Sequence, residues 1–122
     1  MAFGFNNFKH KMADQIFFEE SQQEWEIIDD KIQRQIVGYN DQVMMVIVKF
    51  QTGGIGTLHH HPHIQVTYVS EGKFEVSINN NKKILQKGDS FFVPTEEIHG
   101  VVCLEAGILV DVFSPKREDF LK

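Results

Sequence analysis

The stretch HIQVTYVSEGKFEVSINNNKKILQ, residues 63–86, decides the fold class of this chain. Within it, the apolar Phe74, Val76 and Ile78 alternate with polar neighbours, which predicts a strand with one buried face. The three asparagines that follow favour a hairpin turn, because asparagine tolerates the left-handed backbone that a tight turn needs. Runs rich in β-branched and aromatic residues flank this strand on both sides, at 63–70 and 82–86. The stretch therefore predicts consecutive β-strands.

Further runs of the same kind occupy most of the chain. They are rich in β-branched and aromatic residues, and they cover 32–39, 42–50, 90–94, 98–104 and 107–113. Turn residues such as Gly53-Gly54 and Gly88-Asp89 separate them. A strand about every eight to twelve residues is typical of an all-β sandwich or barrel, which is the fold class we expect.

The length of 122 residues fits one domain with a single core. We expect the barrel domain to span 31–122, preceded by an N-terminal extension, 1–30. Within that extension, MADQIFFEES (12–21) fits either a short helix or an added edge strand. At the other end of the chain, SPKREDFL (114–121) predicts one helical turn, with the serine as its cap and the proline in the first helical position.

The composition excludes several classes of protein. Twelve basic residues against 17 acidic ones give a net charge of −5, and the basic residues are scattered, so we expect no nucleic-acid partner. The only cysteine, Cys103, allows neither an intrachain disulfide nor a metal site built on paired thiolates. No apolar run approaches the roughly 18 to 20 residues of a membrane span, and MAFGFNNFKHKMADQ lacks the apolar core of a signal peptide. A cytoplasmic location without membrane contact is the default expectation.

Four of the six histidines stand in GTLHHHPHIQ, residues 56–65. Alternate side chains of an extended segment point to the same side, so His59, His61, His63 and Gln65 share a face. Pro62 suits an extended path and bars a helix here. His59 and His61 would then project about 6 to 7 Å apart and could converge on one metal ion.

The other histidines divide into weaker and stronger candidates. His60 should face away from its neighbours, and His63, just past the proline, fits a residue of the surrounding pocket better than a ligand. A third histidine ligand must come from elsewhere in the chain. His99 lies in a strand-like segment, whereas His10 lies in the N-terminal extension.

These spacings resemble the two sequence motifs of the cupin superfamily. Two positions depart from the usual pattern: Glu96 stands where a turn glycine is common, and Cys103 stands where the second motif ends in asparagine. Glutamine also replaces the usual glutamate of the first motif. The matching positions are Gly53, His59, His61, Gln65 and Gly72 for the first motif, and Gly88, Pro94 and His99 for the second.

The resemblance implies a double-stranded β-barrel, or jelly roll, with one divalent cation held by His59, His61, Gln65 and His99. A neutral glutamine would leave the ion its full charge, which favours an anionic substrate. Mixed imidazole and oxygen ligands do not choose among Ni, Zn, Mn, Fe and Co. The alternative is a cupin without metal, in which the histidines only form hydrogen bonds in a polar barrel mouth.

A closer resemblance covers most of the chain. The segments that carry it are RQIVGYNDQVMMVIVKF (34–50), LHHHPHIQVTYVSEGKFEVSI (58–78), GDSFFVP (88–94) and DVFSPKREDFL (111–121). They are similar to the KdgF family of pectin and alginate degradation, which converts 4,5-unsaturated monouronates into open-chain keto forms. This likeness implies functional roles for Asp111, Phe113 and Arg117.

The three implied residues also have structural interpretations. Asp111 suits an acid–base group, and Arg117 suits a clamp for the substrate carboxylate, but the two could instead form an ion pair. Phe113 could be a plain core residue rather than a platform for the sugar. Gln33, Arg34 and Tyr68 are further candidates for the barrel mouth.

Two other functions stay open at this point. One is a different metal-dependent cupin enzyme, such as a dioxygenase or a sugar isomerase, and the other is a non-catalytic sugar-binding cupin. As partners we expect a small anionic sugar acid and a second copy of the chain. Exposed strand edges invite pairing, so the homodimer should involve the N-terminal segment.

Overall fold

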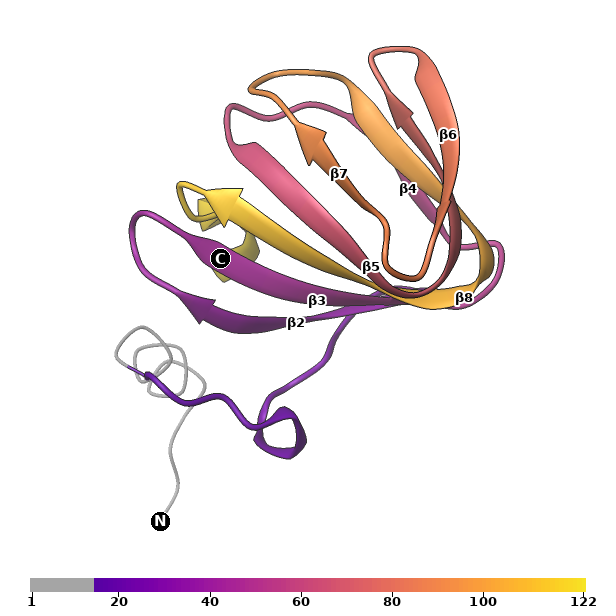
Figure 1. Cartoon of the computed structure of the whole chain (residues 1–122). Coiled ribbons are helices and arrows are strands. Elements are labelled where there is room, and N and C mark those ends of the chain that lie inside the picture. Colours follow the sequence, from indigo (N-terminus) through magenta and orange to yellow (C-terminus); the bar gives the residue numbers. More distant parts are fainter. Residues whose placement is uncertain (1–14) are drawn as a thin grey trace.

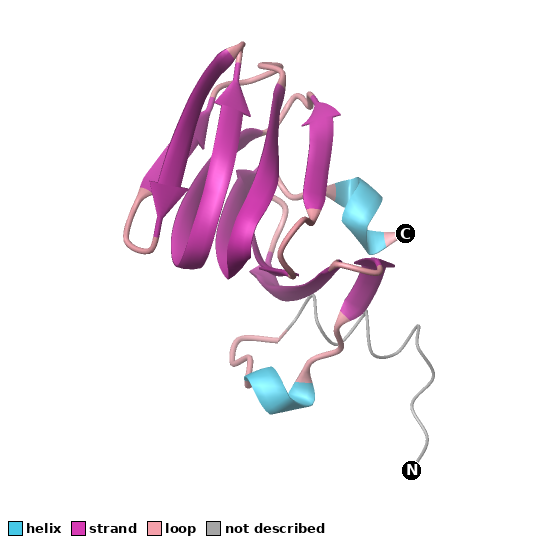
Figure 2. Cartoon of the chain, turned by 90° about the vertical axis from the view of Figure 1, so that its right-hand side faces the viewer, coloured by secondary structure: helices cyan, strands magenta, loops and turns pink. Residues whose placement is uncertain are grey.

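The alternating runs pair as antiparallel strands that curl into a barrel (Figure 1). The computed structural model describes residues 15–122. Its elements are the 3₁₀ turn η1 (Glu20–Gln22), the strands β1 (Glu26–Asp29), β2 (Ile32–Tyr39), β3 (Met44–Phe50), β4 (Ile55–His59), β5 (Ile64–Ile78), β6 (Asn81–Gln86), β7 (Ser90–Val93) and β8 (His99–Ser114), and the 3₁₀ turn η2 (Glu118–Leu121). Within these residues no helix could cross a membrane (Figure 2). The predicted all-β barrel is confirmed.

Strands β5 and β8 run through both sheets of the barrel. The first half of β5 pairs with β7 and its second half with β6. The first half of β8 pairs with β4 and its second half with β3, and β5 and β8 pair with each other along their length. Two long bent strands are thus shared by two facing sheets, which gives the jelly roll that the resemblance implied.

Glycine makes the shared bend possible. At the corner, a Cβ atom on Gly72 would lie 2.6 Å from the carbonyl oxygen of Ala106, and one on Gly107 would lie 2.2 Å from that of Glu71. Gly72 also has a φ of +84°, a left-handed backbone that glycine adopts without steric cost. The two backbones can therefore cross here only without side chains.

The bend corrects the predicted strand boundaries. The runs 63–70 and 73–78 form the single strand β5, and the runs 98–104 and 107–113 form the single strand β8. The glycines between them mark a close backbone approach rather than a strand end. Strands β1 and β4 were not among the predicted strands, because both are short and the second follows a Gly-Gly pair.

The two ends of the chain differ from expectation in detail. Of the segment 12–21, residues 12–14 lie outside the described residues, 15–19 form no regular element, and η1 follows; the edge strand comes later, as β1. The C-terminal turn begins at Glu118, so Ser114 is not its cap. Ser114 instead ends β8 opposite Ile64, and its hydroxyl donates to the carbonyl oxygen of Gln42 at 2.7 Å.

Two turns use a left-handed backbone without glycine. Asn79 and Asn80 have φ values of +48° and +68° and close the β5–β6 hairpin, as the triple asparagine predicted. In the β7–β8 turn Glu96 has a φ of +64°, at the position where the family pattern has glycine. Its backbone N–H donates to the carbonyl oxygen of His61 at 2.8 Å, and its carboxylate lies 2.8 Å from His60 Nδ1. The turn before His99 is thereby tied to the histidine-rich segment.

Most buried apolar residues lie together inside the barrel. We call this cluster the apolar core; Phe50 and Phe74 meet in it edge to face, with ring centroids 5.1 Å apart. Its members are Ile32, Phe50, Val69, Phe74, Val76, Cys103 and Leu109. A smaller group, Met44, Val46 and Phe113, packs toward the C-terminal turn with Phe120. The apolar core forms the floor under the site described next.

Candidate metal centre

Three histidines converge at the end of the barrel where β5 begins and β8 ends, at the left in Figure 1. His59 ends β4 and lies directly opposite His99, the first residue of β8. His61 follows β4, and its ring centroid lies 4.7 Å from that of His99. One ring nitrogen from each histidine lies within 4.8 Å of the others, a spacing that could hold one metal ion.

Backbone carbonyl groups fix the orientation of all three rings. Each Nδ1 contacts the carbonyl oxygen of a residue two positions away. Because a carbonyl oxygen only accepts, Nδ1 is the donor, and Nε2 of the neutral ring then carries no hydrogen. Burial lowers the pKa of each imidazole, that of His99 to about 4. Neutral rings with an oriented lone pair are what metal ligation requires. The contacts are His59 to Thr57 at 2.8 Å, His61 to His63 at 3.0 Å and His99 to Glu97 at 2.9 Å.

Gln65 completes a cluster of unpaired acceptors. Its Oε1 lies 3.1 Å from Nε2 of His61, which is a bare acceptor when the neutral ring donates through Nδ1 to the carbonyl oxygen of His63. Two acceptors therefore face each other, which is unfavourable unless a cation lies between them. Nε2 of His99 is also buried and has no hydrogen-bond partner within residues 15–122. These lone pairs fit a divalent cation, and His59, His61, Gln65 and His99 are the residues that would hold it.

Asp111 faces this cluster from β8. Its Oδ1 accepts a 2.6 Å hydrogen bond from the hydroxyl of Thr67 and lies 3.5 Å from the amide nitrogen of Gln65. Burial raises the pKa of Asp111 to about 6, although the Thr67 hydrogen bond and the charge of Arg117 act in the opposite direction. A carboxyl group with this pKa can both accept and return a proton near neutral pH.

Arg117 and Phe113 stack beside the cluster. The guanidinium group of Arg117 lies over the rings of Phe120 and Phe113, at 4.2 and 5.0 Å from their centroids. Its Nε and Nη2 donate to the two carboxylate oxygens of Asp119 at 3.0 and 2.8 Å. Asp119, and not Asp111, is thus the ion-pair partner that the structure gives Arg117. Phe113 is almost fully buried and meets His61 edge to face, so it is both a core residue and a wall of the site.

A cavity of about 430 Å³ opens beside the cluster. Six of the seven ligand and catalytic residues proposed from the sequence line it, and His61 is the exception. Those that line it are His59, Gln65, His99, Asp111, Phe113 and Arg117. A larger hollow of about 510 Å³, between the β1–β2 hairpin and the bend of β8, contains none of them. We place the site in the smaller cavity, because the unpaired acceptors and the raised carboxyl pKa are there.

Other residues named from the sequence lie in different places. Arg34 lines the cavity, with its guanidinium carbon 3.7 Å from the ring centroid of Phe120, whereas Gln33 lines the other hollow. Tyr68 is half exposed on the outside of the barrel. His60 is exposed, and His63 contacts the carbonyl oxygen of Lys116 through Nε2 at 3.1 Å.

Two residues of the site were not found from the sequence. Thr67 has the same strand parity as Gln65, which could have marked it. Phe120, stacked between Arg34 and Arg117, gave no sequence signal beyond its place in the C-terminal turn.

Comparison with known proteins finds a matching domain family and a similar protein. The cupin domain family matches residues 46–113. Pectin degradation protein KdgF of Dickeya dadantii (strain 3937) is 48% identical over 107 residues, which are 86% of this chain and 97% of that protein.

Solved structures agree with these matches. An RmlC-like cupin from Shewanella frigidimarina NCIMB 400 is 46% identical, with a TM-score of 0.85 over 87% of this chain and 96% of its own. KdgF from a Halomonas species is 40% identical, with a TM-score of 0.83 over 87% of this chain and 98% of its own. The fold, the histidine cluster and these matches lead to one conclusion: the chain is a cupin of the KdgF family.

Proposed function

We propose that this protein is a metal-dependent enzyme that converts 4,5-unsaturated monouronates, released from pectin or alginate, into linear keto forms. The observation that carries the proposal is the position of Asp111, which lines the same cavity as His59, His99 and Gln65 and has its Oδ1 3.5 Å from the Gln65 amide nitrogen. The 48% identity to a protein named for pectin degradation supports the substrate class.

The proposed reaction needs one group that moves a proton twice. The substrate is a cyclic hemiacetal whose ring oxygen is bound to C5 of a C4=C5 double bond. Asp111 takes the C1 hydroxyl proton, the C1=O bond forms, and the bond between C1 and the ring oxygen breaks. Asp111 then returns the proton to C4 as the C5 enolate becomes a ketone, so no atom is gained or lost. The raised pKa of Asp111, about 6, suits both transfers.

The donor set explains why a charged substrate would bind. A divalent cation held there would supply electrostatic stabilisation to the substrate carboxylate and to negative charge that develops on the ring oxygen. Three neutral imidazoles and a neutral amide would cancel none of its charge. The identity of the metal stays open among Ni, Zn, Mn, Fe and Co.

Arg117 would hold the substrate in place. Its bonds to Asp119 use Nε and Nη2, and Nη1 is the guanidinium nitrogen that they do not use. Stacking on Phe113 and Phe120 fixes the plane of the group. Phe113 would contact the sugar ring from the cavity wall.

The test is an assay with the purified, metal-loaded protein. On addition of 4,5-unsaturated galacturonate or mannuronate, we expect the absorbance of the conjugated double bond to fall faster than in a control without protein. The same rate in both samples would refute the proposal. Oxygen consumption with a catechol, flavonol or thiol substrate would favour the dioxygenase, and sugar binding without turnover would favour the binding module.

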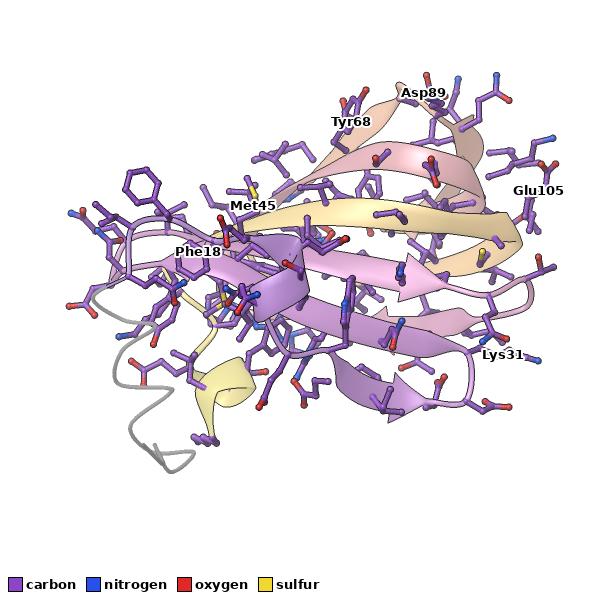
Figure 3. All side chains as sticks on the ribbon, turned by 90° about the horizontal axis from the view of Figure 1, so that it is seen from below. Phe18, Lys31, Met45, Tyr68, Asp89 and Glu105 are labelled. Atoms are coloured by element: carbon purple, nitrogen blue, oxygen red, sulfur yellow. The ribbon has the colours of Figure 1, made fainter. Side chains whose placement is uncertain are left out.

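We also infer that the protein forms a homodimer. On the outside of the β3–β8–β5–β7 sheet, apolar side chains lie in register across four strands, in the row Met45, Val112, Val66 and Phe92. Met45, Val66 and Phe92 are 41 to 52% exposed, and Met45 and Tyr68 lie on this outer side in Figure 3. An exposed apolar sheet face of this kind supports self-association. Light scattering should give twice the chain mass for the wild type and the monomer mass for Val66→Lys. A cytoplasmic location stays a prediction.

A further inference from the structure

A chain of hydrogen bonds joins the histidine cluster to Asp111. Gln65 lies between the two, with Oε1 3.1 Å from His61 Nε2 and Nε2 2.9 Å from the hydroxyl oxygen of Thr67. The Thr67 hydroxyl in turn lies 2.6 Å from Asp111 Oδ1. Thr67 is fully buried, so no solvent molecule from outside the barrel competes for this hydroxyl.

Donor counting fixes the direction of this chain. A threonine hydroxyl has one hydrogen, and an ionised carboxylate only accepts, so the hydrogen of Thr67 points to Asp111. The hydroxyl can then only accept from its other neighbour, the amide of Gln65. Since the donors of an amide are on its nitrogen, Nε2 must face Thr67 and Oε1 must face the histidines.

The sheet register enforces the same arrangement. Thr67 lies directly opposite Asp111 in the β5–β8 ladder, and Gln65, two residues before Thr67, lies on the same face of β5. The three side chains therefore meet inside the barrel without any change of backbone.

We infer that Thr67 is a positioning residue: it holds the Gln65 amide with its oxygen toward the three histidines, where a cation is proposed to bind. The assignment rests on the proposed metal site. A reversed amide would direct its NH₂ group at the bare nitrogen of His61 and form a hydrogen bond there. That bond would remove the oxygen donor from the cluster and occupy a histidine lone pair, so it would compete with the cation.

Two substitutions separate the hydroxyl of Thr67 from its shape. Thr67→Val keeps the branched shape and removes the hydroxyl, whereas Thr67→Ser keeps the hydroxyl and removes a methyl group. Calorimetric titration with Zn²⁺ should show about 10- to 100-fold weaker binding for Thr67→Val, the usual loss when a partner of a metal ligand is removed. Thr67→Ser should stay within about threefold of the wild type. Far-UV circular dichroism checks that both variants are folded.

The outcomes that would overturn the assignment are distinct. Wild-type affinity in folded Thr67→Val would show that the hydroxyl is not needed, and an equal loss in both variants would show that shape alone matters.

A second measurement on the metal-free protein is independent of metal binding and of turnover. In NMR spectra of the wild type, the side-chain amide protons of Gln65 should show contacts to the methyl group of Thr67. In Thr67→Val they should move to the ring protons of His61, and contacts to His61 already in the wild type would overturn the inference. If the wild type bound none of Zn²⁺, Ni²⁺ and Mn²⁺, the proposed metal site would fall, and this NMR result would decide the role of Thr67 alone.

Discussion

The two ends of this barrel are built from the same two strands, but one end is an apolar core and the other is a polar site. In the apolar core, β5 and β8 direct Val69, Phe74 and Leu109 inward, whereas at the other end they direct Gln65, Thr67 and Asp111 inward. We call the second group, with His59, His61 and His99, the polar end. The backbone pattern is the same in both, so the inward side chains alone decide which end stabilises the fold and which can carry chemistry.

The energetic contrast between the ends is large. Each large side chain in the apolar core stabilises the fold by about 1.5 to 3 kcal/mol through burial. At the polar end, His99 has a buried nitrogen without a partner in the described part of the chain, and Asp111 has a raised pKa; both cost stability. Substitutions at the two ends should therefore separate stability from function.

The largest effect is expected at the proposed cation ligands. His99→Ala should weaken Zn²⁺ binding by more than about 100-fold, beyond what loss of a supporting residue costs, because it removes one of three imidazole donors. Turnover should fall to background with it. Metal content by mass spectrometry and the absorbance assay check both.

The matched control is His60→Ala. His60 is exposed and lies outside the cluster, so this variant should keep the metal content and activity of the wild type. Normal metal content in His99→Ala would remove His99 from the ligand set.

Asp111→Asn should separate chemistry from metal binding. The variant keeps the shape of the side chain and an oxygen that can accept from Thr67, so metal content should be unchanged. Turnover should fall by about 10²- to 10⁴-fold, the usual contribution of an acid–base group. Steady-state kinetics at saturating substrate measure it, and wild-type turnover in Asp111→Asn would refute the acid–base role.

A substitution in the apolar core should lower stability and leave metal binding unchanged. Phe74→Ala removes a fully buried ring that packs on Phe50, and it should lower the free energy of unfolding by about 3 to 5 kcal/mol. Metal affinity per folded molecule should not change. Urea unfolding measures the loss.

Two further variants calibrate that result. Phe74→Leu should lose less, because it keeps more of the volume. Ile84→Ala, at a position that is 56% exposed on β6, should cost little. Equal losses at Phe74 and Ile84 would contradict the division of the barrel into two ends.

Sequence patterns predicted the local parts of this structure and missed those that depend on register. Alternation in 73–78 and the triple asparagine predicted a strand and its hairpin, because both act between neighbours in the chain. The sequence around Gly72 predicts a strand end, since only the facing backbone at Gly107 shows that the strand continues.

The residues of the site also divide into those that local geometry predicts and those that depend on strand register. The parity of His59 and His61 follows from local geometry, and the structure brings both to one cluster. The contact of Thr67 with Asp111 depends on how β5 and β8 are aligned, across 44 residues of sequence. No spacing within one motif encodes that alignment, so the positioning role of Thr67 could only be inferred from the fold.

The smallest expected effect is a pH dependence that compares two groups of the polar end. Asp111 has a pKa raised from 3.8 to about 6, so its contribution to stability is full below pH 4 and is lost as the pH rises through about 6. His99 has a pKa lowered from 6.5 to about 4, so its contribution is full above pH 6.5 and is lost as the pH falls toward 4. In the metal-free wild type the two changes oppose each other and flatten the stability curve between pH 4 and 6.5.

Asp111→Asn should reveal the contribution of His99. Without the titrating carboxyl group, the metal-free variant should gain stability steadily between pH 4 and 6.5. Above pH 6.5 its free energy of unfolding should exceed that of the wild type by about 2 kcal/mol. The whole shift of the Asp111 pKa, at roughly 1.4 kcal/mol per pKa unit, would give a larger difference, but water in the cavity screens the charge. Below pH 4 the difference should vanish, because the carboxyl group of the wild type is then protonated too. Urea unfolding at a series of pH values measures the difference, and a gap that does not depend on pH would show that burial does not raise the pKa of Asp111.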